Sequence, residues 1–173
     1  MWKSSFLAII ACCFIMITAP AAPDDKAPDK KPAEKYVKLV HTDTGKVLSI
    51  ADNSEADEAK AVLAKDDGSQ SSHWKIVKDG EHLKLVNRKS EKVLDVKDQS
   101  KDEDGQIVQW EDKSNDNDNQ RWSWVGDEKE KSRRLKSKWS ELVLDVGDGG
   151  TIVQKKADEK AKTQLWKVVE VKE

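Results

Sequence analysis

Residues 95–120 contain the side-chain types that can bind a polyhydroxylated ligand. The candidates among them are one carboxylate, three amides and one indole: Asp95, Gln109, Asn119, Gln120 and Trp110. A carboxylate accepts hydrogen bonds from neighbouring hydroxyls, an amide both donates and accepts, and an aromatic ring packs against an apolar face. A neutral sugar offers hydroxyls and one apolar face, so this segment has the chemistry of a sugar site.

Two other segments carry parts of the same set. Residues 145–164 retain Asp145, Gln154 and Gln164 but have Lys155 in the place of Trp110 and Thr163 in the place of Asn119, so they form at most a weak or altered site. In the earlier segment, Ser49 replaces the Asp, Ala64-Lys65 replaces Gln-Trp, and Ser72-His73 replaces Asn-Gln. We expect no sugar site there.

Strand geometry limits how Trp110 can act. Adjacent strand residues point to opposite faces, so Trp110 can join a site beside Gln109 only if its strand bulges or ends there. A Trp that covers the rim of the core is the alternative. Asp95 can equally cap a turn, and Asn119 can bond its own turn.

The sequence shows no pattern of an enzyme, a cofactor site or a metal site. We find no Cys nucleophile, Ser elbow, HExxH or phosphate loop, and the three His lack metal-binding spacing. Residues 100–111 imitate an EF-hand loop, but Ser100 stands at its first position and the flanks resemble strands. A solvated acidic loop is the interpretation we prefer.

From Tyr36 onward the sequence repeats three times, over about 36–79, 80–126 and 127–173. Each copy has short β-branched runs separated by Gly, Asp, Asn and Ser, which favour strands and hairpins. Each copy also closes on a tryptophan, at Trp74, Trp122 and Trp166. We treat 54–65, which has helix propensity but no broad apolar stripe, as a loop or a single turn.

The repeats predict an all-β domain with pseudo-threefold symmetry, because none of the three units can bury its apolar face alone. A three-bladed propeller is the geometric rival, but each blade would have too little core. The predicted core contains the three closing tryptophans and nine aliphatic residues: Leu39, Leu48, Ile50, Leu85, Leu94, Val96, Leu135, Leu144 and Val146.

A Leu-Asp-Val strand, a Val-Gln strand and a Gln-x-Trp closure in register resemble the ricin B-type (R-type) lectin β-trefoil, in a Cys-poor bacterial-type form. Gln120 and Gln164 keep the closing Gln, whereas the first repeat has Ser72. The resemblance implies a carbohydrate-binding module with its best site in the second repeat, where Asp95, Gln109 and Asn119 contact the sugar and Gln120 holds Asp95. A degenerate trefoil with a structural or protein-binding role is the alternative.

The first 35 residues differ from the repeats. Residues 1–21 have a basic residue, a 12-residue apolar run and Ala19-Pro20-Ala21, which predicts a cleaved signal peptide and a secreted protein. A lipoprotein site at Cys12 is the alternative. Residues 22–35 predict an extended linker. The rest of the chain has no second apolar stretch, so we expect no membrane span.

The charged residues indicate no nucleic-acid partner. The chain has 31 Lys and Arg and 33 Asp and Glu, and the two signs are interspersed along the sequence rather than gathered into a basic patch. Glycans are therefore the expected partners, and a protein partner stays open under the alternative function.

Overall fold

The structure is a computed structural model that describes residues 34–114, 117–127 and 129–172. These residues form 12 strands: β1 (Val37–His41), β2 (Val47–Ile50), β3 (Ala61–Ala64), β4 (Trp74–Asp79), β5 (His82–Asn87), β6 (Val93–Val96), β7 (Ile107–Trp110), β8 (Trp122–Val125), β9 (Arg134–Ser137), β10 (Val143–Val146), β11 (Ile152–Lys155) and β12 (Trp166–Glu170). Each repeat contributes four of them, as the short β-branched runs predict.

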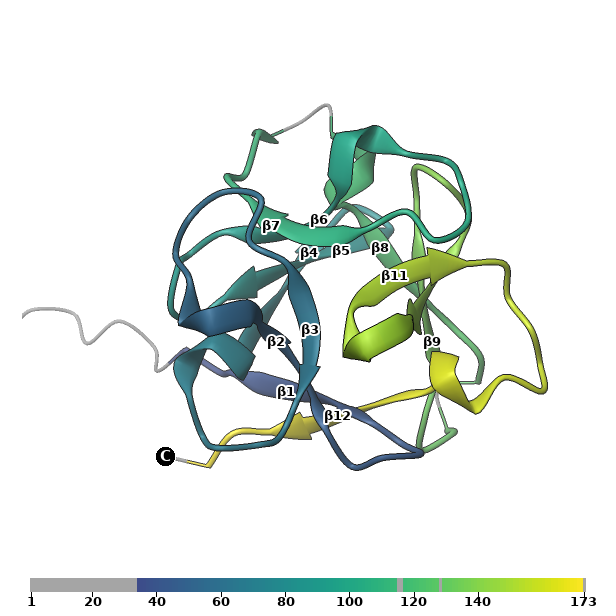
Figure 1. Ribbon diagram of the computed structural model, residues 1–173, viewed down its shortest axis with the longest axis horizontal. Helices are drawn as coiled ribbons and strands as arrows, with labels where there is room; N and C mark the ends of the chain where they lie inside the picture. Colours follow the sequence, from purple (N-terminus) through teal and green to yellow (C-terminus); the bar gives the residue numbers. More distant parts are fainter. Residues whose placement is uncertain (1–33, 115–116, 128, 173) are drawn as a thin grey trace, which may run out of the picture. The chain divides into compact units, whose positions relative to one another are not determined.

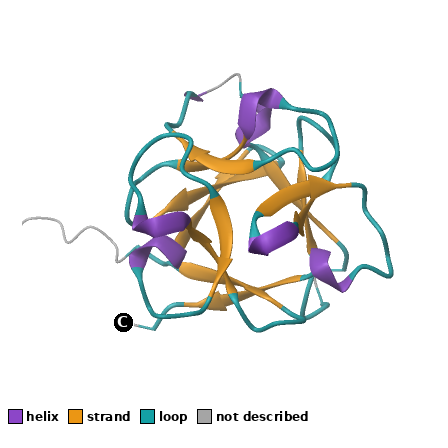
Figure 2. Ribbon diagram, in the orientation of Figure 1, coloured by secondary structure: helices purple, strands orange, loops and turns teal. Residues whose placement is uncertain are grey.

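Short 3-10 turns connect the strands (Figure 2). They are η1 (Ala51–Asn53), η2 (Gln70–Ser72), η3 (Lys97–Gln99), η5 (Asp118–Gln120), η6 (Asp148–Gly150) and η7 (Lys162–Gln164). Within the described ranges the only helical segments are of this kind, so the all-β prediction is confirmed.

Strands β1, β4, β5, β8, β9 and β12 form a closed barrel. Neighbours pair antiparallel around the ring, and a bridge between Arg133 and Trp166 closes it from the end of β9 to β12. The other strands form three hairpins, β2–β3, β6–β7 and β10–β11, arranged around one axis (Figure 1). Single bridges join each hairpin to the other two. This architecture is a β-trefoil.

The core follows the prediction closely. Every residue predicted to lie there is at most 2% exposed, except Val146, which is half-buried and packs against the cluster. The indole Nε1 of Trp74 donates to the Leu48 carbonyl at 3.0 Å, and that of Trp122 donates to the Leu94 carbonyl at 3.1 Å. Each of these tryptophans therefore joins the barrel to the hairpin of its own repeat.

The prediction that residues 54–65 form a loop or a single turn is wrong in part. Ala61–Ala64, which we placed in a loop or single turn, forms β3 and pairs with β2 in the register Leu48↔Leu63. Two alanines in four residues conceal the strand pattern, and pairing with β2 overrides their weak strand propensity.

The same unusual turn follows the second strand of every repeat. Two consecutive residues have positive φ, at Asp52-Asn53, Asp98-Gln99 and Gly149-Gly150. Glycine adopts this left-handed conformation without the steric cost that a Cβ brings. The two glycines of the third repeat therefore adopt this turn without steric strain. The second repeat instead places the side chains of Asp98 and Gln99 there.

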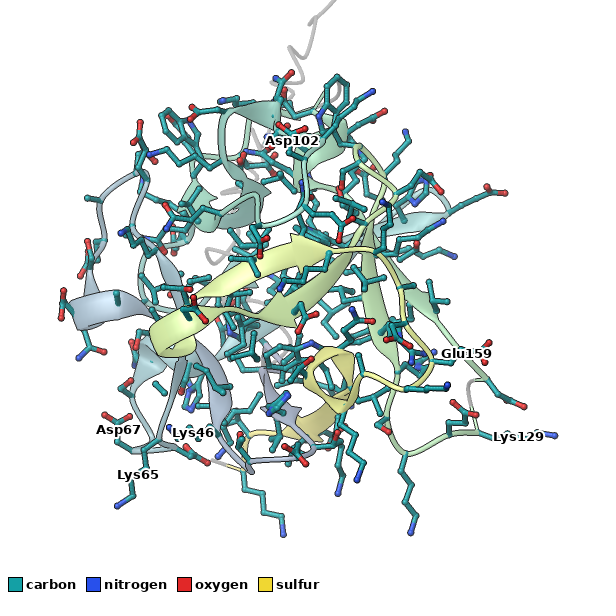
Figure 3. All side chains as sticks on the ribbon, turned by 45° about the vertical axis from the view of Figure 1, so that its right-hand side comes forward. Lys46, Lys65, Asp67, Asp102, Lys129 and Glu159 are labelled. Carbon is teal, nitrogen blue, oxygen red and sulfur yellow. The ribbon has the colours of Figure 1, made fainter. Side chains whose placement is uncertain are left out.

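The predicted signal peptide at 1–21 lies outside the described residues, as does most of the predicted 22–35 linker. At its end, the carboxylate of Glu34 accepts hydrogen bonds from the Tyr36 hydroxyl at 2.6 Å and the Lys75 ammonium at 2.8 Å. The described part of the chain holds no helix long and apolar enough to cross a membrane. Charged side chains of both signs project outward, as Lys65, Asp67, Lys129 and Glu159 do in Figure 3.

Candidate functional site

Asp95 is a buried carboxylate that two amides hold in place. It lies on β6 and is 3% exposed. Its Oδ1 accepts a hydrogen bond from Asn119 Nδ2 at 2.9 Å, and its Oδ2 accepts one from Gln120 Nε2 at 2.9 Å. Because η5 carries both amides, one turn fixes the plane of the carboxylate and leaves each oxygen a second lone pair.

Gln120 also fixes the chain that follows Trp110. Its Nε2 donates to the Glu111 carbonyl at 2.9 Å, and its Oε1 accepts from the Lys113 amide at 3.2 Å. One side chain thus holds the carboxylate and the end of β7 together. Gln120 is a positioning residue in this geometry.

Burial raises the pKa of Asp95 to about 6. Hydrogen bonds from Gln120 and Asn119 and the charge of Lys113 favour the ionised form, but they compensate the lost hydration only partly. Keeping a charged acceptor in this position therefore opposes folding at neutral pH.

Trp110 lies on the same face as Asp95. The register pairs Val93 with Trp110 and Asp95 with Val108, and residues paired across antiparallel strands share a face. Val93 and Asp95 are two residues apart and so share that face as well. Trp110 and Gln109, which are adjacent in the strand, point to opposite faces, and Trp110 is the one on the side of Asp95.

A pocket of about 290 Å³ lies beside Asp95. Its walls are Asp95, Asp98, Gln99, Trp110, Lys113 and Asn119. The Lys113 ammonium lies 4.6 Å from the centroid of the Trp110 ring, so a cation and an indole face the pocket together. The pocket therefore combines acceptors, donors and an aromatic surface.

Three pocket residues were absent from the sequence prediction: Asp98, Gln99 and Lys113. Asp98 and Gln99 lie in the turn just after the strand that carries Asp95. Their closeness to Asp95 in the sequence could have indicated them. Their turn is stabilised from the third repeat, because Trp139 Nε1 donates to the Gln99 carbonyl at 2.5 Å. Nothing in the local sequence of the second repeat indicates that contact.

Gln109, predicted as a sugar contact, lies away from the pocket. It pairs with Leu94, so its side chain points to the face opposite Asp95, and it is fully buried. Its Nε2 donates to the Ser54 carbonyl at 3.1 Å and the Ala56 carbonyl at 2.9 Å, and its Oε1 accepts from the Ser90 hydroxyl at 2.7 Å. Gln109 joins the second repeat to a loop of the first.

A Gln109→Leu substitution should cost about 2–3 kcal/mol of folding free energy, because it leaves buried carbonyls without donors. Urea unfolding measures this cost, and Gln154→Leu should cost about the same. If Gln109→Leu instead removed ligand binding at unchanged stability, this assignment would be wrong.

The third repeat reproduces the frame of the second. Gln164 Nε2 donates to Asp145 Oδ2 at 2.9 Å and to the Lys156 carbonyl at 2.8 Å, as Gln120 does in its own repeat. Gln154 is fully buried and donates to the Ser100 and Asp102 carbonyls at 3.1 and 2.9 Å. The two predicted glutamines are thus frame residues, and only Asp145 has the place of a ligand acceptor.

The third repeat lacks the walls of a pocket. Asp145 Oδ1 accepts from the backbone amide of Val146 at 2.7 Å, because Thr163 supplies no amide to replace Asn119. Gly149 and Gly150 present no side chains, and Lys155 pairs with Asp104 at 3.2 Å. Asp145 is therefore a structural counterpart to Asp95 without its surroundings.

The first repeat has no carboxylate at this position. Ser49 and Ser71 hydroxyls lie 3.1 Å apart and are buried, so Ser71, rather than Ser72, matches Asn119. Ser72 and not His73 then occupies the position of Gln120, which agrees with the Gln-x-Trp register and shifts the Asn-Gln assignment of the first repeat by one residue. A serine pair holds this turn without offering a charged acceptor.

The acidic loop at 100–105 is tied to the third repeat. The Gln154 amide donates to the Ser100 and Asp102 carbonyls of the loop. Lys155 forms an ion pair with Asp104, and Lys156 forms one with Glu103. Among the described residues, no group of three or more His, Cys, Asp or Glu side chains could hold a metal ion.

Comparisons with known proteins agree with this fold. A model of the ricin-type β-trefoil lectin domain matches residues 81–173, and a model of the related lectin-like domain matches residues 29–111. No curated protein sequence matches the chain.

Solved structures show the same similarity. The designed threefold-symmetric protein ThreeFoil is 29% identical, with a TM-score of 0.72 over 79% of this chain and 99% of its own. The exo-β-1,3-galactanase 1,3Gal43A of Clostridium thermocellum is 36% identical, with a TM-score of 0.73 over 81% of this chain and 31% of its own. The Macrolepiota procera lectin, solved with lactose, is 14% identical, with a TM-score of 0.65 over 78% of this chain and 94% of its own.

The closed barrel, the three hairpins and the Gln-x-Trp frame define a β-trefoil of the lectin class. The chain belongs to the ricin-type β-trefoil lectin domain family. It spans about a third of the galactanase that it matches.

Proposed function

We propose that this protein is a secreted, non-catalytic lectin whose sugar site is the pocket beside Asp95. The observation that carries the proposal is a buried carboxylate, fixed by Asn119 and Gln120, in a pocket that Trp110 borders. Sugar hydroxyls donate to the free lone pairs of Asp95, the Asn119 amide oxygen accepts, and the apolar face of the sugar packs on Trp110. Gln120 positions Asp95, and Gln109 takes no part in contacting the ligand.

Galactose-containing glycans are the first ligands to test, because the 36% identical relative is a β-1,3-galactanase. A shallow open pocket of this kind binds weakly, roughly in the millimolar to micromolar range. We propose no hydrolysis, since both oxygens of Asp95 are held by amides as acceptors.

A glycan array that includes β-1,3-galactan fragments tests the proposal, followed by calorimetry on the glycans that bind. We expect Trp110→Ala to weaken binding about tenfold, since loss of an aromatic platform removes on the order of 1 kcal/mol. Trp110→Phe should retain most of the affinity. No binding above background by the wild-type protein would refute the lectin function.

A protein-interaction role is the second candidate, and the state of the other repeats favours it. The serine pair of the first repeat and Lys155 of the third show that the fold persists without the full site. A partner captured equally by the wild type and by Asp95→Ala would favour this role over sugar binding.

The location outside the cell rests on residues 1–21, which lie outside the described residues. We propose cleavage after Ala21. The mass of the protein recovered from the growth medium tests this directly, and a lipid-modified Cys12 would contradict it.

A further inference from the structure

One end of the barrel is open between β4–β5 and β8–β9. Ile76 pairs with Leu85, and Trp124 pairs with Leu135. Both leucines are fully buried inside the barrel, and paired residues share a face, so Ile76 and Trp124 also face inward. Ile76 is nevertheless 36% exposed. The barrel mouth is therefore accessible to solvent.

A hollow of about 430 Å³ lies in this mouth. Ile76, Leu83 and Trp124 supply apolar walls, and Lys78, His82 and Arg133 supply polar ones. Glu81 borders it, and the Glu130 carboxylate lies at Gly126, another lining residue, beside the Arg133 side chain. The hollow shares no residue with the pocket beside Asp95.

Arg133 occupies a position where the other two repeats have an aliphatic residue. It lies two residues before the buried Leu135, as Val37 and Leu83 lie two residues before Leu39 and Leu85. The fold accepts an aliphatic side chain at this position in two repeats and does not require a charge. The Arg133 guanidinium lies 5.1 Å from the centroid of the Trp124 ring, at the mouth.

Among the described residues, the cations that line the hollow form no ion pair with a carboxylate, although Glu81 and Glu130 lie nearby. Many lysines of this chain form ion pairs, for example Lys38, Lys84 and Lys92. In the described part of the chain, neither Lys78 nor Arg133 has a carboxylate within ion-pair distance. His82 Nδ1 is also buried without a hydrogen-bond partner. An anion in the hollow would pair with Lys78 and Arg133.

We propose that the barrel mouth binds a small organic anion, a carboxylate or sulfonate on an aromatic or aliphatic body. The anion pairs with Arg133 and Lys78, and its apolar body packs on Ile76, Leu83 and Trp124. The proposal is independent of sugar binding, because the two sites share no residue.

A matched pair of fluorescent probes tests the proposal. 1-Anilinonaphthalene-8-sulfonate carries an anion, and N-phenyl-1-naphthylamine has the same aromatic body without it. We expect Arg133→Leu, which restores the aliphatic pattern, to weaken sulfonate binding about tenfold, as loss of a charge-assisted contact does. Binding of the neutral probe should stay the same or tighten.

Lys78→Met should weaken sulfonate binding in the same direction, and Lys46→Met, outside the hollow, should not. Near-ultraviolet circular dichroism and glycan binding check that Arg133→Leu keeps the fold. Equal sulfonate affinity in the wild type and Arg133→Leu would overturn the proposal. So would loss of a dimer in Arg133→Leu, seen by sedimentation, with neither probe bound, because the mouth would then be an interface between two copies.

Discussion

Asp95→Asn should bind glycan about 100-fold more weakly than the wild type at neutral pH. The carboxylate can accept charge-assisted hydrogen bonds from two sugar hydroxyls, each stabilising the complex by about 1.5–3 kcal/mol, and an amide can accept only one weaker bond. Calorimetric titration with the glycan selected on the array measures the loss.

Asp145→Asn is the matched control. Asp145 is buried as Asp95 is, and Gln164 holds it as Gln120 holds Asp95, but Asp145 has no aromatic wall. The control should keep the wild-type affinity. Equal losses in both variants would mean that the carboxylates act through the fold and not through the ligand.

The raised pKa of Asp95 makes the same variant informative about stability. An unfolded Asp titrates near 3.8, and the folded protein binds that proton up to about pH 6. Between these values the folded state holds more protons, so the contribution of Asp95 to stability falls as pH rises. A difference of about two pKa units corresponds to roughly 3 kcal/mol.

Asp95→Asn should therefore gain stability relative to the wild type as pH rises from about 4 to 7, by roughly 3 kcal/mol. Urea unfolding at the two pH values measures this change without interference from the other carboxylates, which are the same in both proteins. Glycan binding by the wild type should weaken below about pH 6, where Asp95 takes up its proton. A pH-independent difference would contradict the raised pKa.

Trp122→Ala should destabilise the domain by about 4 kcal/mol, the largest stability effect that we expect. Trp122 is fully buried where the barrel meets the β6–β7 hairpin, and the substitution removes a large packed ring and its bond to Leu94. Thermal and urea unfolding measure the loss. Substitution of Trp139, which is only half-buried, should cost far less.

The third closing tryptophan offers a finer test. Trp166 is 1% exposed, but its Nε1 has no hydrogen-bond partner among the described residues, whereas Trp122 Nε1 has one. Trp122→Phe loses that bond, and Trp166→Phe instead removes an unsatisfied donor, so Trp122→Phe should cost about 1–2 kcal/mol more. Equal costs would show that packing alone decides both.

The fold could be predicted because its determinants recur in the sequence. Three copies in one register place Leu39, Leu85 and Leu135 at equivalent positions, and all three are fully buried. β3 escaped prediction because Ala61 and Ala64 give no strand pattern by themselves. Its pairing with β2 comes from the fold and not from local propensity.

The candidate site was predictable in part for a related reason. Asp95, Asn119 and Gln120 come together because strand and closing turn meet within one repeat. Gln109 was misplaced because its partners Ser54 and Ala56 belong to another repeat, as does the Trp139 that holds Gln99. Contacts between repeats have no signature in the sequence of either repeat alone.

The most direct test of the sugar site follows the tryptophan indole N–H signals by NMR during titration with a glycan selected on the array. The Trp110 signal, assigned with Trp110→Phe, should shift with the binding curve, and the signals of Trp74, Trp122 and Trp166 should stay in place. A saturable interaction that leaves the Trp110 signal unchanged would show that the glycan binds elsewhere.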